Sequence, residues 1–387
     1  MSARLEETVA LLDRLVAFPT ISSDSNLAMI ADLAARLTDV GARVEMFTDD
    51  TGAKANLFAT LGPEGDGGLI LSGHTDVVPV AEQDWSSDPF VMREDAGRLY
   101  GRGTCDMKGF IAAAIVMAQD YAQVDLKRPL HFAFTYDEEV GCLGARNLVP
   151  ELQKRGLRPA MAIIGEPTLM GVIEGHKGCC EYTVRFGGRE GHGSAPDRGV
   201  NAVEYAVRYV SRLMELRGEL MARAPRNSRY QPAWSTINIG SLRGGVAHNV
   251  IAGKAELEWE TRPVQRGDLA FVKEAITAYV AQELLPAMRA VYPEASIETD
   301  VIGETPGLEV LDENAARDLV AGLVGANGSD VVPFGTEAGL FQEMGMSVVV
   351  CGPGSIDQAH KPDEFVSVDQ LAACLTMLDK LGHSLVA

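Results

Sequence analysis

The chain has 387 residues, a length that favours two domains, and its 46% hydrophobic and 23% charged residues are the balance of an ordinary globular protein rather than a disordered or fibrous one. Because 34 Lys and Arg stand against 54 Asp and Glu, the formal net charge is −20, and nucleic-acid binding is not expected. No apolar stretch approaches the ~20 residues that span a bilayer, which predicts no membrane partner.

The N-terminus and the cysteines indicate a cytoplasmic chain. The first 16 residues carry acidic side chains and helical periodicity where a signal peptide would have basic residues and a continuous apolar core. The six cysteines are scattered and include no Cys-x-x-Cys pair, so we expect free thiols in a reducing compartment and no cysteine metal ligands.

The first third of the sequence alternates between helical and strand-like patterns. Apolar residues recur at helical spacing from Leu5 to Val16, and this run ends at Phe18-Pro19 because proline disfavours helix in the residue before it. Strand-like runs follow at 55–62, 68–78, 130–139 and 161–167, with helical segments at 108–122 and 142–155. Short runs that are apolar on both faces and alternate with helices predict an α/β domain, with a largely parallel sheet flanked by helices.

The pattern of apolar and polar residues changes at about residue 179. Expected elements are a strand at 179–188, a helix at 198–222, strands at 235–242 and 252–263, a helix at 267–289 and a strand at 296–303. This order is that of the ferredoxin-like α+β unit. The α/β pattern of the first third then returns, with an apolar run at 346–354 and a last helix from about 367. The sequence thus predicts one domain from 1–178 and 304–387, and a second domain, 179–303, inserted into it.

Polar side chains gather where the predicted strands of the first domain end. In an open α/β sheet, ligands bind outside the carboxyl ends of the strands. The residues found there, or just before the helix at 108–122, are His74, Asp76, Asp106, Glu138, Glu139, Glu166 and His360. Imidazole and carboxylate ligands without thiolate suit divalent zinc, cobalt or manganese.

Each of these residues also has an ordinary structural interpretation. His74 could be a satisfied strand-end histidine, Asp106 could cap the following helix, and the Glu138-Glu139 pair could complement a helix dipole. Their coincidence at one sheet edge argues against all three interpretations together. Asp76, two residues after His74 on the same side of an extended chain, can fix the tautomer of that imidazole.

The adjacent Glu138 and Glu139 predict a division of roles. Neighbours in an extended segment point to opposite sides, so one can bind metal while the other faces the substrate. A carboxylate beside a metal-activated water is positioned to take its proton. The pattern therefore predicts metal-assisted hydrolysis.

Six segments together resemble a known family. They are GHTDVVP (73–79), GRGTCDMKG (101–109), DEEVG (137–141), GEPT (165–168), GHGSAP (191–196) and DQAHKPDE (357–364). In order and spacing they resemble the co-catalytic zinc deacylases, which include aminoacylase, succinyl-diaminopimelate desuccinylase and acetylornithine deacetylase. The likeness covers nearly the whole chain, and GEPT, HKGCCEYTV, RGVNAVEY, FGTEAGLF and GPGSIDQAHKPDE look most like the acetylornithine deacetylase branch.

The resemblance implies a reaction, a cofactor and a set of roles. The reaction is hydrolysis of N2-acetyl-L-ornithine to L-ornithine and acetate, a step of arginine biosynthesis. It would use a hydroxide shared by two divalent ions, with zinc favoured and cobalt as the alternative. Asp106 would bridge the ions, His74 and Glu166 would complete one site, and Glu139 and His360 the other. Glu138 would be the general base and Asp76 the partner of His74.

The resemblance also assigns the inserted domain as a lid and dimerisation domain. His192 in GHGSAP would polarise the scissile carbonyl, in its own or the partner subunit's site, while Asn249 and Arg262 would bind the substrate. The guanidinium of Arg262 suits an α-carboxylate because its fork can bind both oxygens. Without the family, His192 between glycines is an ordinary surface-loop residue. Gly193, after His192, and Cys105, before Asp106, depart from the family pattern, but neither is a proposed ligand. A homodimer is the expected assembly.

The segment FGTEAG is expected to set specificity. Thr336 and Glu337 would line the substrate pocket, with Glu337 facing the side-chain ammonium of acetylornithine. The alternative is that Glu337 only occupies the first turn of the following helix.

Several other functions compete with this one. A dinucleotide-binding oxidoreductase would need a third glycine in register after Gly101-Arg102-Gly103, and the chain has none. A thiol or serine hydrolase would need a supporting motif around Cys105 or Ser194. A non-catalytic binding relative should have lost ligands or the base. Within the family, the runners-up are succinyl-diaminopimelate desuccinylase and a broader N-acyl-amino-acid deacylase.

Overall fold

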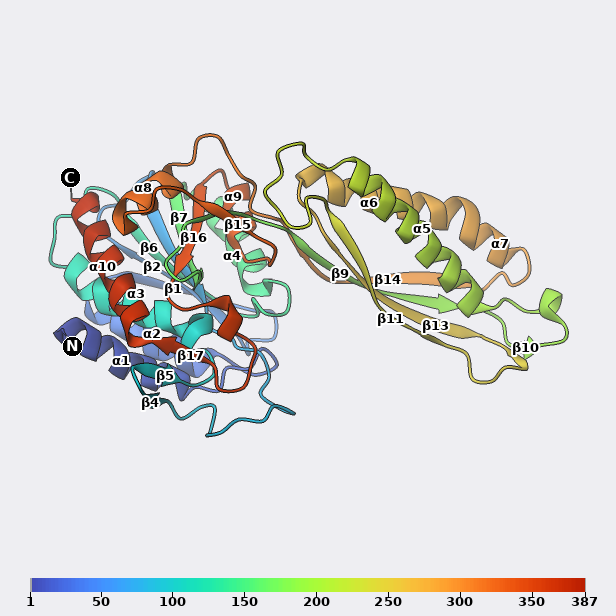
Figure 1. The fold of residues 1–387 in the computed structure, drawn as a ribbon, viewed down its shortest axis with the longest axis horizontal. Coiled ribbons are helices and arrows are strands. Elements are labelled where there is room, and N and C mark those ends of the chain that lie inside the picture. Colours follow the sequence, from blue (N-terminus) through green and yellow to red (C-terminus); the bar gives the residue numbers. More distant parts are fainter. Residues whose placement is uncertain (1, 387) are drawn as a thin grey trace. The chain divides into compact units, whose positions relative to one another are not determined.

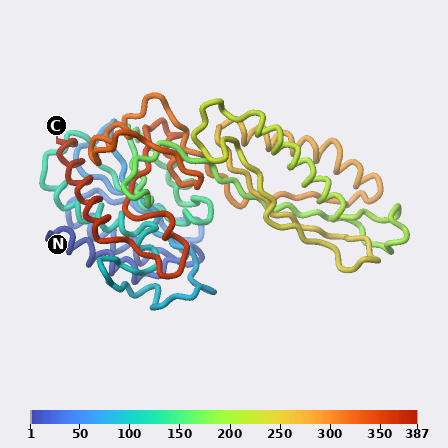
Figure 2. Tube along the Cα trace, viewed as in Figure 1, coloured from blue at the N-terminus to red at the C-terminus, as the bar shows by residue number. Residues whose placement is uncertain are grey.

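The computed structural model describes residues 2–386, which divide into two compact units. Unit 1 holds the residues up to Gly175, Val310–Val331, and the residues from Thr336 onward. Unit 2 holds His176–Glu309 and Val332–Gly335. The two ends of the chain thus build unit 1 and the middle builds unit 2, as the colours of Figure 2 show.

Unit 1 is built on an eight-stranded sheet (Figure 1). In spatial order its strands are β1 (Arg43–Thr48), β2 (Ala55–Leu61), β6 (Leu130–Thr135), β3 (Leu69–His74), β7 (Met161–Pro167), β16 (Ser347–Gly352), β8 (Ile173–His176) and β15 (Asp330–Val332). The central strands β6, β3, β7 and β16 run parallel, whereas β1, β2 and β8 pair antiparallel. The carboxyl ends of the parallel strands therefore share one edge.

Helices cover the sheet because its central strands have no polar face to expose. Every residue of β3 and β6 is buried, which is typical of parallel strands packed on both sides. The helices of this unit are α1 (Ala3–Val16), α2 (Leu27–Asp39), α3 (Gly109–Tyr121), α4 (Leu143–Lys154), α8 (Ala315–Val324), α9 (Ala338–Glu343) and α10 (Val368–Leu385). Helix α3 is buried over most of its surface, in keeping with its nearly uninterrupted apolar sequence.

A second, three-stranded sheet in unit 1 has the order β17-β5-β4. Its strands are β4 (Arg93–Asp95), β5 (Arg98–Tyr100) and β17 (Phe365–Ser367). Strand β17 pairs antiparallel with β5. The segment before β17 and the segment after β5 are therefore brought side by side.

Unit 2 is an antiparallel sheet with two long helices and a core of its own. Its order β11-β13-β9-β14 is that of the ferredoxin-like unit, which confirms the predicted fold class. The elements are β9 (Cys179–Gly187), α5 (Ala202–Ala222), β11 (Thr236–Gly244), β13 (Lys254–Arg262), α6 (Arg266–Tyr279) and β14 (Ser296–Thr305). Helix α6 continues through the π-helical turn Val280–Leu284 into α7 (Leu285–Arg289), and the short strands β10 (Gly191–His192) and β12 (Val250–Ile251) form a separate pair.

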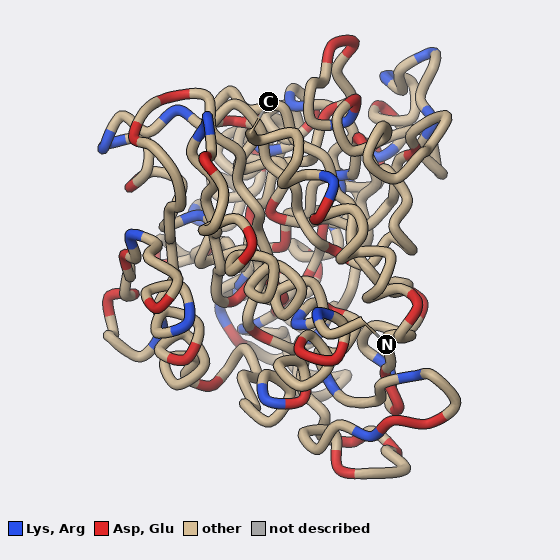
Figure 3. Tube along the Cα trace, turned by 90° about the vertical axis from the view of Figure 1, so that its left-hand side faces the viewer, with Lys and Arg blue, Asp and Glu red and all other residues tan. Residues whose placement is uncertain are grey.

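Charged residues of both signs occur along the whole chain. Figure 3 shows positions of Lys and Arg interspersed with positions of Asp and Glu along the Cα trace. Among the residues that the structure describes, no helix is both long and apolar enough to cross a membrane.

Candidate metal centre

The ends of the parallel strands position most of the polar side chains predicted from the sequence. His74 is the last residue of β3, Glu166 lies in β7, and Glu138 and Glu139 lie in the turn after β6. Asp106 lies in the turn Thr104–Lys108 before α3, where its backbone is extended rather than helical. His360 lies between β16 and β17. All of these segments belong to unit 1.

Asp106 lies between the two histidines. Its Oδ1 is 2.9 Å from His74 Nε2, and its Oδ2 is 3.4 Å from His360 Nε2. On the far sides, His74 Nε2 is 3.8 Å from Glu166 Oε1, and His360 Nε2 is 3.0 Å from Glu139 Oε2. One carboxylate thus presents an oxygen toward each of two histidine–glutamate pairs, which is the arrangement that a bridging ligand requires.

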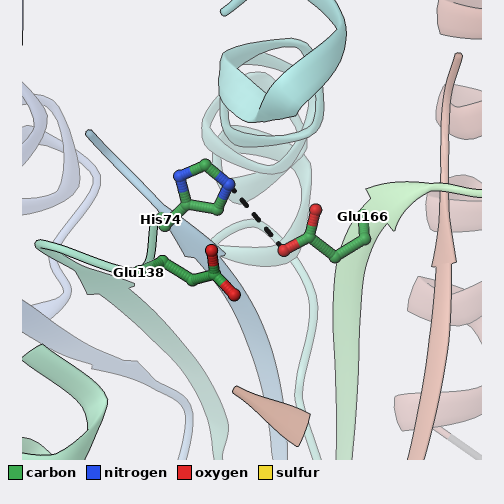
Figure 4. A group of neighbouring side chains, drawn as sticks. All are labelled: His74, Glu138 and Glu166. Carbon is green, nitrogen blue, oxygen red and sulfur yellow. Dashed lines mark ion pairs between the residues drawn. The ribbon is translucent and has the colours of Figure 1, made fainter. Parts of the chain in front are cut away.

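Two groups of ligand atoms have the spacing to hold a metal ion. His74, Glu138 and Glu166 form one group, and His74, Asp106 and Glu139 form another, with ligand atoms within 4.8 Å of one another in each. Figure 4 shows the imidazole of His74 and the carboxylates of Glu138 and Glu166 directed toward a common point. Glu138, expected as a base rather than a ligand, is therefore within coordinating reach as well.

The electrostatics of this cluster favour a cation. Burial raises the pKa of Glu138 and Glu166 well above the ordinary range, and it raises the pKa of Glu139 to about 6, with nearby carboxylates adding to the effect. The pKa of Asp106 is lowered, because hydrogen bonds from His360 and His74 outweigh its burial. Four acids thus share one small region with two imidazoles. Divalent ions would relieve the repulsion, so the oxygen and nitrogen donors present here fit two such ions.

Asp76 forms hydrogen bonds with His74 and with the backbone of Glu138 and Glu139. Its backbone oxygen is 2.8 Å from His74 Nδ1, which leaves Nε2 directed at the cluster. Its carboxylate accepts hydrogen bonds from the backbone N–H groups of Glu138 at 3.0 Å and Glu139 at 3.3 Å. The Ser22 hydroxyl donates to the same carboxylate at 2.7 Å. Sequence reasoning misses Ser22, because no motif marks a serine 54 residues away as its partner.

Thr336 and Glu337 are buried, each 1% exposed. The two carboxylate oxygens of Glu337 accept hydrogen bonds from the hydroxyls of Ser72 in β3 at 2.5 Å and of Thr135 at the end of β6 at 2.8 Å. The hydroxyl oxygen of Thr336 accepts a hydrogen bond from the N–H of Ala338 at 3.0 Å. Both side chains are thus engaged within the fold, and recognition of an ammonium group by Glu337 stays a prediction.

In unit 2, the structure places His192 beside Asn249. Strand β10 pairs with β12, and the N–H of Gly193 donates to the backbone oxygen of Asn249 at 2.8 Å. His192 and Asn249 are exposed, and His192 Nδ1 lies 2.7 Å from the Ser194 hydroxyl.

Arg262 lies at the other end of unit 2. It ends β13, and its guanidinium pairs with Glu260 at 3.0 Å. The β10–β12 pair adjoins the opposite end of that strand, where Lys254 pairs with Gly187. The two ends, Lys254 and Arg262, are eight residue steps apart along the strand, or about 26 Å. Unit 2 therefore does not bring Arg262 together with His192 and Asn249.

A third group with metal-ligand spacing, Cys179, Glu181 and Glu260, lies in unit 2. Its charge is already matched in part by Arg262, which pairs with Glu260. We assign it no metal.

Comparisons with known proteins support the assignment of a family. Residues 70–383 match the model of peptidase family M20/M25/M40. The acetylornithine deacetylase of Edwardsiella ictaluri (strain 93-146) is 38% identical over 390 residues, which cover 99% of each chain. The acetylornithine deacetylase of Yersinia pestis is 37% identical over 379 residues, which cover 95% of each.

Solved structures share the fold. An M20 family metallo-carboxypeptidase from Sulfolobus solfataricus superposes with a TM-score of 0.76 at 16% identity, covering 97% of this chain and 98% of that one. A Bacillus subtilis protein described as a dinuclear metal-binding peptidase of the M20 family gives a TM-score of 0.64 at 17% identity, covering 99% and 98%. The chain belongs to peptidase family M20/M25/M40, as its motifs predict.

Proposed function

We propose that this protein hydrolyses the amide bond of N2-acetyl-L-ornithine to give L-ornithine and acetate. The full-length similarity to proteins named acetylornithine deacetylase supports the substrate. The observation that carries the hydrolytic chemistry is the position of Asp106 between His74 and His360, with Glu138 beside them. A cytoplasmic location stays a prediction from the sequence.

Two divalent ions, zinc or cobalt, would be held by His74, Asp106, Glu139, Glu166 and His360. When bound, they would lower the pKa of an attacking water and polarise the scissile carbonyl. Asp106 would hold both ions, because its two oxygens face different histidines. Asp76 would keep the Nδ1 proton of His74 in place, so that Nε2 offers its lone pair.

Glu138 would move the proton. Its carboxylate would accept a proton from the attacking water and deliver it to the departing amine, so that acetate and a free α-amino group result. Glu138 lies beside His74 and Glu166, with ligand atoms within 4.8 Å, which places its carboxylate next to an ion held there.

Glu138→Gln tests this role. We expect kcat for acetylornithine to fall by about 10²- to 10⁴-fold, because the amide cannot accept the proton. Zinc affinity, measured by calorimetric titration of the metal-free protein, should stay close to that of the unchanged protein. If zinc binding is lost along with activity, Glu138 is a ligand rather than the base.

Substrate binding would require two copies of the chain. An N-acyl amino acid is about as long as two or three extended residues, ~10 Å, whereas Arg262 lies about 26 Å of strand away from His192 and Asn249. One substrate molecule therefore cannot contact all three residues of the same copy. We propose a homodimer in which Arg262 of one copy binds the α-carboxylate, while a second copy provides His192 to the carbonyl and Asn249 to the substrate.

The alternative is another acyl substrate of the same family. Metal-loaded enzyme should be assayed with acetylornithine, acetylcitrulline, acetylmethionine and succinyl-diaminopimelate. We expect the highest kcat/KM with acetylornithine. A strong preference for the succinyl substrate would identify a desuccinylase, similar rates on all the acetyl substrates would identify a broad deacylase, and no turnover of any substrate would favour a binding relative.

A further inference from the structure

Two buried side chains of opposite charge lie behind the metal centre. Arg102 and Glu364 are each 1% exposed, and Arg102 Nη1 donates to Glu364 Oε2 at 2.8 Å. The other oxygen of Glu364 accepts two backbone N–H groups, that of Cys105 at 2.9 Å and that of Asp106 itself at 3.1 Å. The backbone of the expected bridging ligand is thus bound directly by Glu364.

The same network reaches the backbone of the second histidine. Arg102 Nη1 donates to the carbonyl oxygen of Lys361 at 3.3 Å, and Arg102 Nη2 donates to Gln83 Oε1 at 2.5 Å. Gln83 Nε2 in turn donates to the carbonyl oxygen of His360 at 3.0 Å. Asp106 and His360, more than 250 residues apart in the sequence, are therefore joined through three side chains.

The segment around His360 needs such support. His360 has a φ of 62° and Asp363 a φ of 55°, in the left-handed region that residues other than glycine rarely adopt. A backbone in that region persists only when its surroundings hold it there. Asp363 is held by Ser86, whose N–H donates at 3.1 Å and whose hydroxyl donates at 2.8 Å to its carboxylate.

Stability alone does not explain this ion pair. A buried ion pair contributes little to stability on average, because desolvation of the two charges opposes their attraction. Here, however, the hydrogen bonds of the pair reach backbone atoms in the two segments that carry Asp106 and His360. Fixing the direction of metal ligands is what hydrogen-bond partners behind a metal site commonly do.

We propose that Gln83, Arg102 and Glu364, here called the Glu364 clamp, are positioning residues that hold Asp106 and His360 in place for the ion bound by Glu139 and His360. The clamp touches neither the substrate nor the ions. The proposal rests on the two-ion centre of the proposed function. It adds that the affinity of the ions depends on the clamp: both are affected through Asp106, and the ion that also has His360 as a ligand is affected most.

The test compares Glu364→Gln and Gln83→Ala with Glu174→Gln as a matched control. Glu364→Gln keeps the shape of the side chain. It removes the negative charge and places an amide where a carboxylate faced Arg102. Gln83 is only half-buried in a loop, so Gln83→Ala should fold even if Glu364→Gln does not. Glu174 is also a buried glutamate of unit 1 paired with an arginine, Arg317, at 2.8 Å, but its contacts with Arg317 and Ser329 do not involve the metal-ligand segments.

Metal-free full-length proteins are titrated with zinc by calorimetry and with cobalt by visible absorption, and circular dichroism melting reports folding. We expect the unchanged protein and Glu174→Gln to bind two ions alike. In Glu364→Gln, the ion bound by Glu139 and His360 should bind about 10- to 100-fold more weakly, with a changed cobalt spectrum. The other ion, which shares only Asp106 with it, should be weakened less. Gln83→Ala should weaken the ion bound by Glu139 and His360 to a smaller extent.

The outcomes separate the two proposals. If the unchanged protein binds fewer than two ions, the proposal of a two-ion centre is wrong. The proposed role of the clamp depends on that centre and is then wrong as well. If the unchanged protein binds two ions and both clamp variants, folded, bind them equally well with the same cobalt spectrum, the clamp alone is wrong. An equal loss in Glu174→Gln would also overturn it, because the effect would then belong to any buried ion pair. If Glu364→Gln does not fold, the ion affinities and cobalt spectrum of Gln83→Ala test the role of the clamp.

Discussion

Glu337 is the residue whose surroundings bear most on specificity. Its carboxylate is 1% exposed and bound by the hydroxyls of Ser72 and Thr135, close to His74. Because both oxygens are used within the fold, we expect Glu337→Gln to lower kcat/KM for acetylornithine and acetylmethionine by the same factor. Parallel kinetics on the two substrates provide the measurement. A much larger loss on acetylornithine would show instead that Glu337 recognises the side-chain ammonium, as the motif alone suggests.

His131 makes stability depend on pH. It is 2% exposed on β6, its Nδ1 lies 2.8 Å from the Thr60 hydroxyl, and its Nε2 is buried with no hydrogen-bond partner among the described residues. Burial, together with Arg43, lowers its pKa to about 4, against ~6.5 in an unfolded chain. Between these values the unfolded chain binds more protons. The contribution to stability is therefore complete above pH 6.5 and is lost as the pH falls toward 4.

His131→Gln should make stability less sensitive to acid. The free energy of unfolding, from urea titrations at pH 7 and pH 5, should change less between the two conditions than in the unchanged protein, by roughly 1–2 kcal/mol. The two proteins share all their carboxylates and metal ligands. The contributions of these groups to the pH dependence therefore cancel in the difference between the two proteins. Equal pH dependence in both would show that the pKa of His131 is the same in the folded and unfolded states.

At the scale of elements, close contact between β7 and its neighbours places Glu166. A Cβ on Gly165 would lie 2.0 Å from Phe110 of α3, and a Cβ on Gly352 of β16 would lie 2.0 Å from the backbone oxygen of Gly165. Glycine is required at both positions because backbone and ring already occupy the space. Glu166 therefore projects from a strand whose position is set by contacts on two sides.

Gly165→Ala should disturb both stability and metal binding. We expect a loss of about 1–3 kcal/mol in the free energy of unfolding, since the added methyl must push Phe110 or β7 aside. Zinc affinity should fall as well, because Glu166 moves with its neighbour. Gly322→Ala in α8 is the control: nothing lies within 4 Å of its Cβ, so it should be neutral or stabilising by up to ~1 kcal/mol. Urea denaturation and zinc titration check both variants.

The elements that could be predicted from the sequence are those with a clear apolar pattern. The run 161–167 is β7, and the run 55–62 is β2 but for its last residue. Strand β1 has no such signal, because it is an edge strand with four of its six residues exposed. Helix α2 lacks the usual start: the side chain of Asn26 bonds Ala55 and Thr75 instead of capping the helix.

The metal cluster could be predicted because most of the candidate ligands lie at the end of a strand or just before a helix, and His360 lies in a motif of the family. The Glu364 clamp could not, although Arg102 and Glu364 lie within motifs that carry Asp106 and His360. Its bonds join side chains to backbone atoms 259 residues away, and no spacing in the sequence indicates such a pairing. Burial of Thr336 and Glu337 likewise depends on tertiary packing rather than on local pattern.

At the scale of the whole molecule, the proposed sharing of a substrate between two copies makes a quantitative prediction. His192→Ala and Arg262→Ala should each be nearly inactive alone. When equal amounts are mixed and allowed to exchange subunits, half of the dimers are mixed, and one of the two sites in each mixed dimer is complete. Activity should therefore recover to about a quarter of that of the unchanged protein.

Light scattering measures the dimer, native mass spectrometry detects the mixed dimers, and the deacetylation rate measures the recovery. Mixing must be compared with each variant incubated by itself at the same total concentration. If the mixture stays inactive although subunits exchange, His192 and Arg262 act within one copy, and the strand length that separates them must then be bridged in another way.

The insertion of unit 2 between β7 and β16 also affects the order in which the protein forms during synthesis. Strand β7 ends at Pro167 and is therefore synthesised in the first half of the chain. Its hydrogen-bonded neighbour in the sheet, β16, ends only at Gly352. Nearly all of unit 2 emerges in the interval and has its own apolar core, so it can become compact first. Until the C-terminal segment arrives, the nascent half-sheet keeps an unpaired apolar edge, which is the stage at which this chain most needs protection from aggregation.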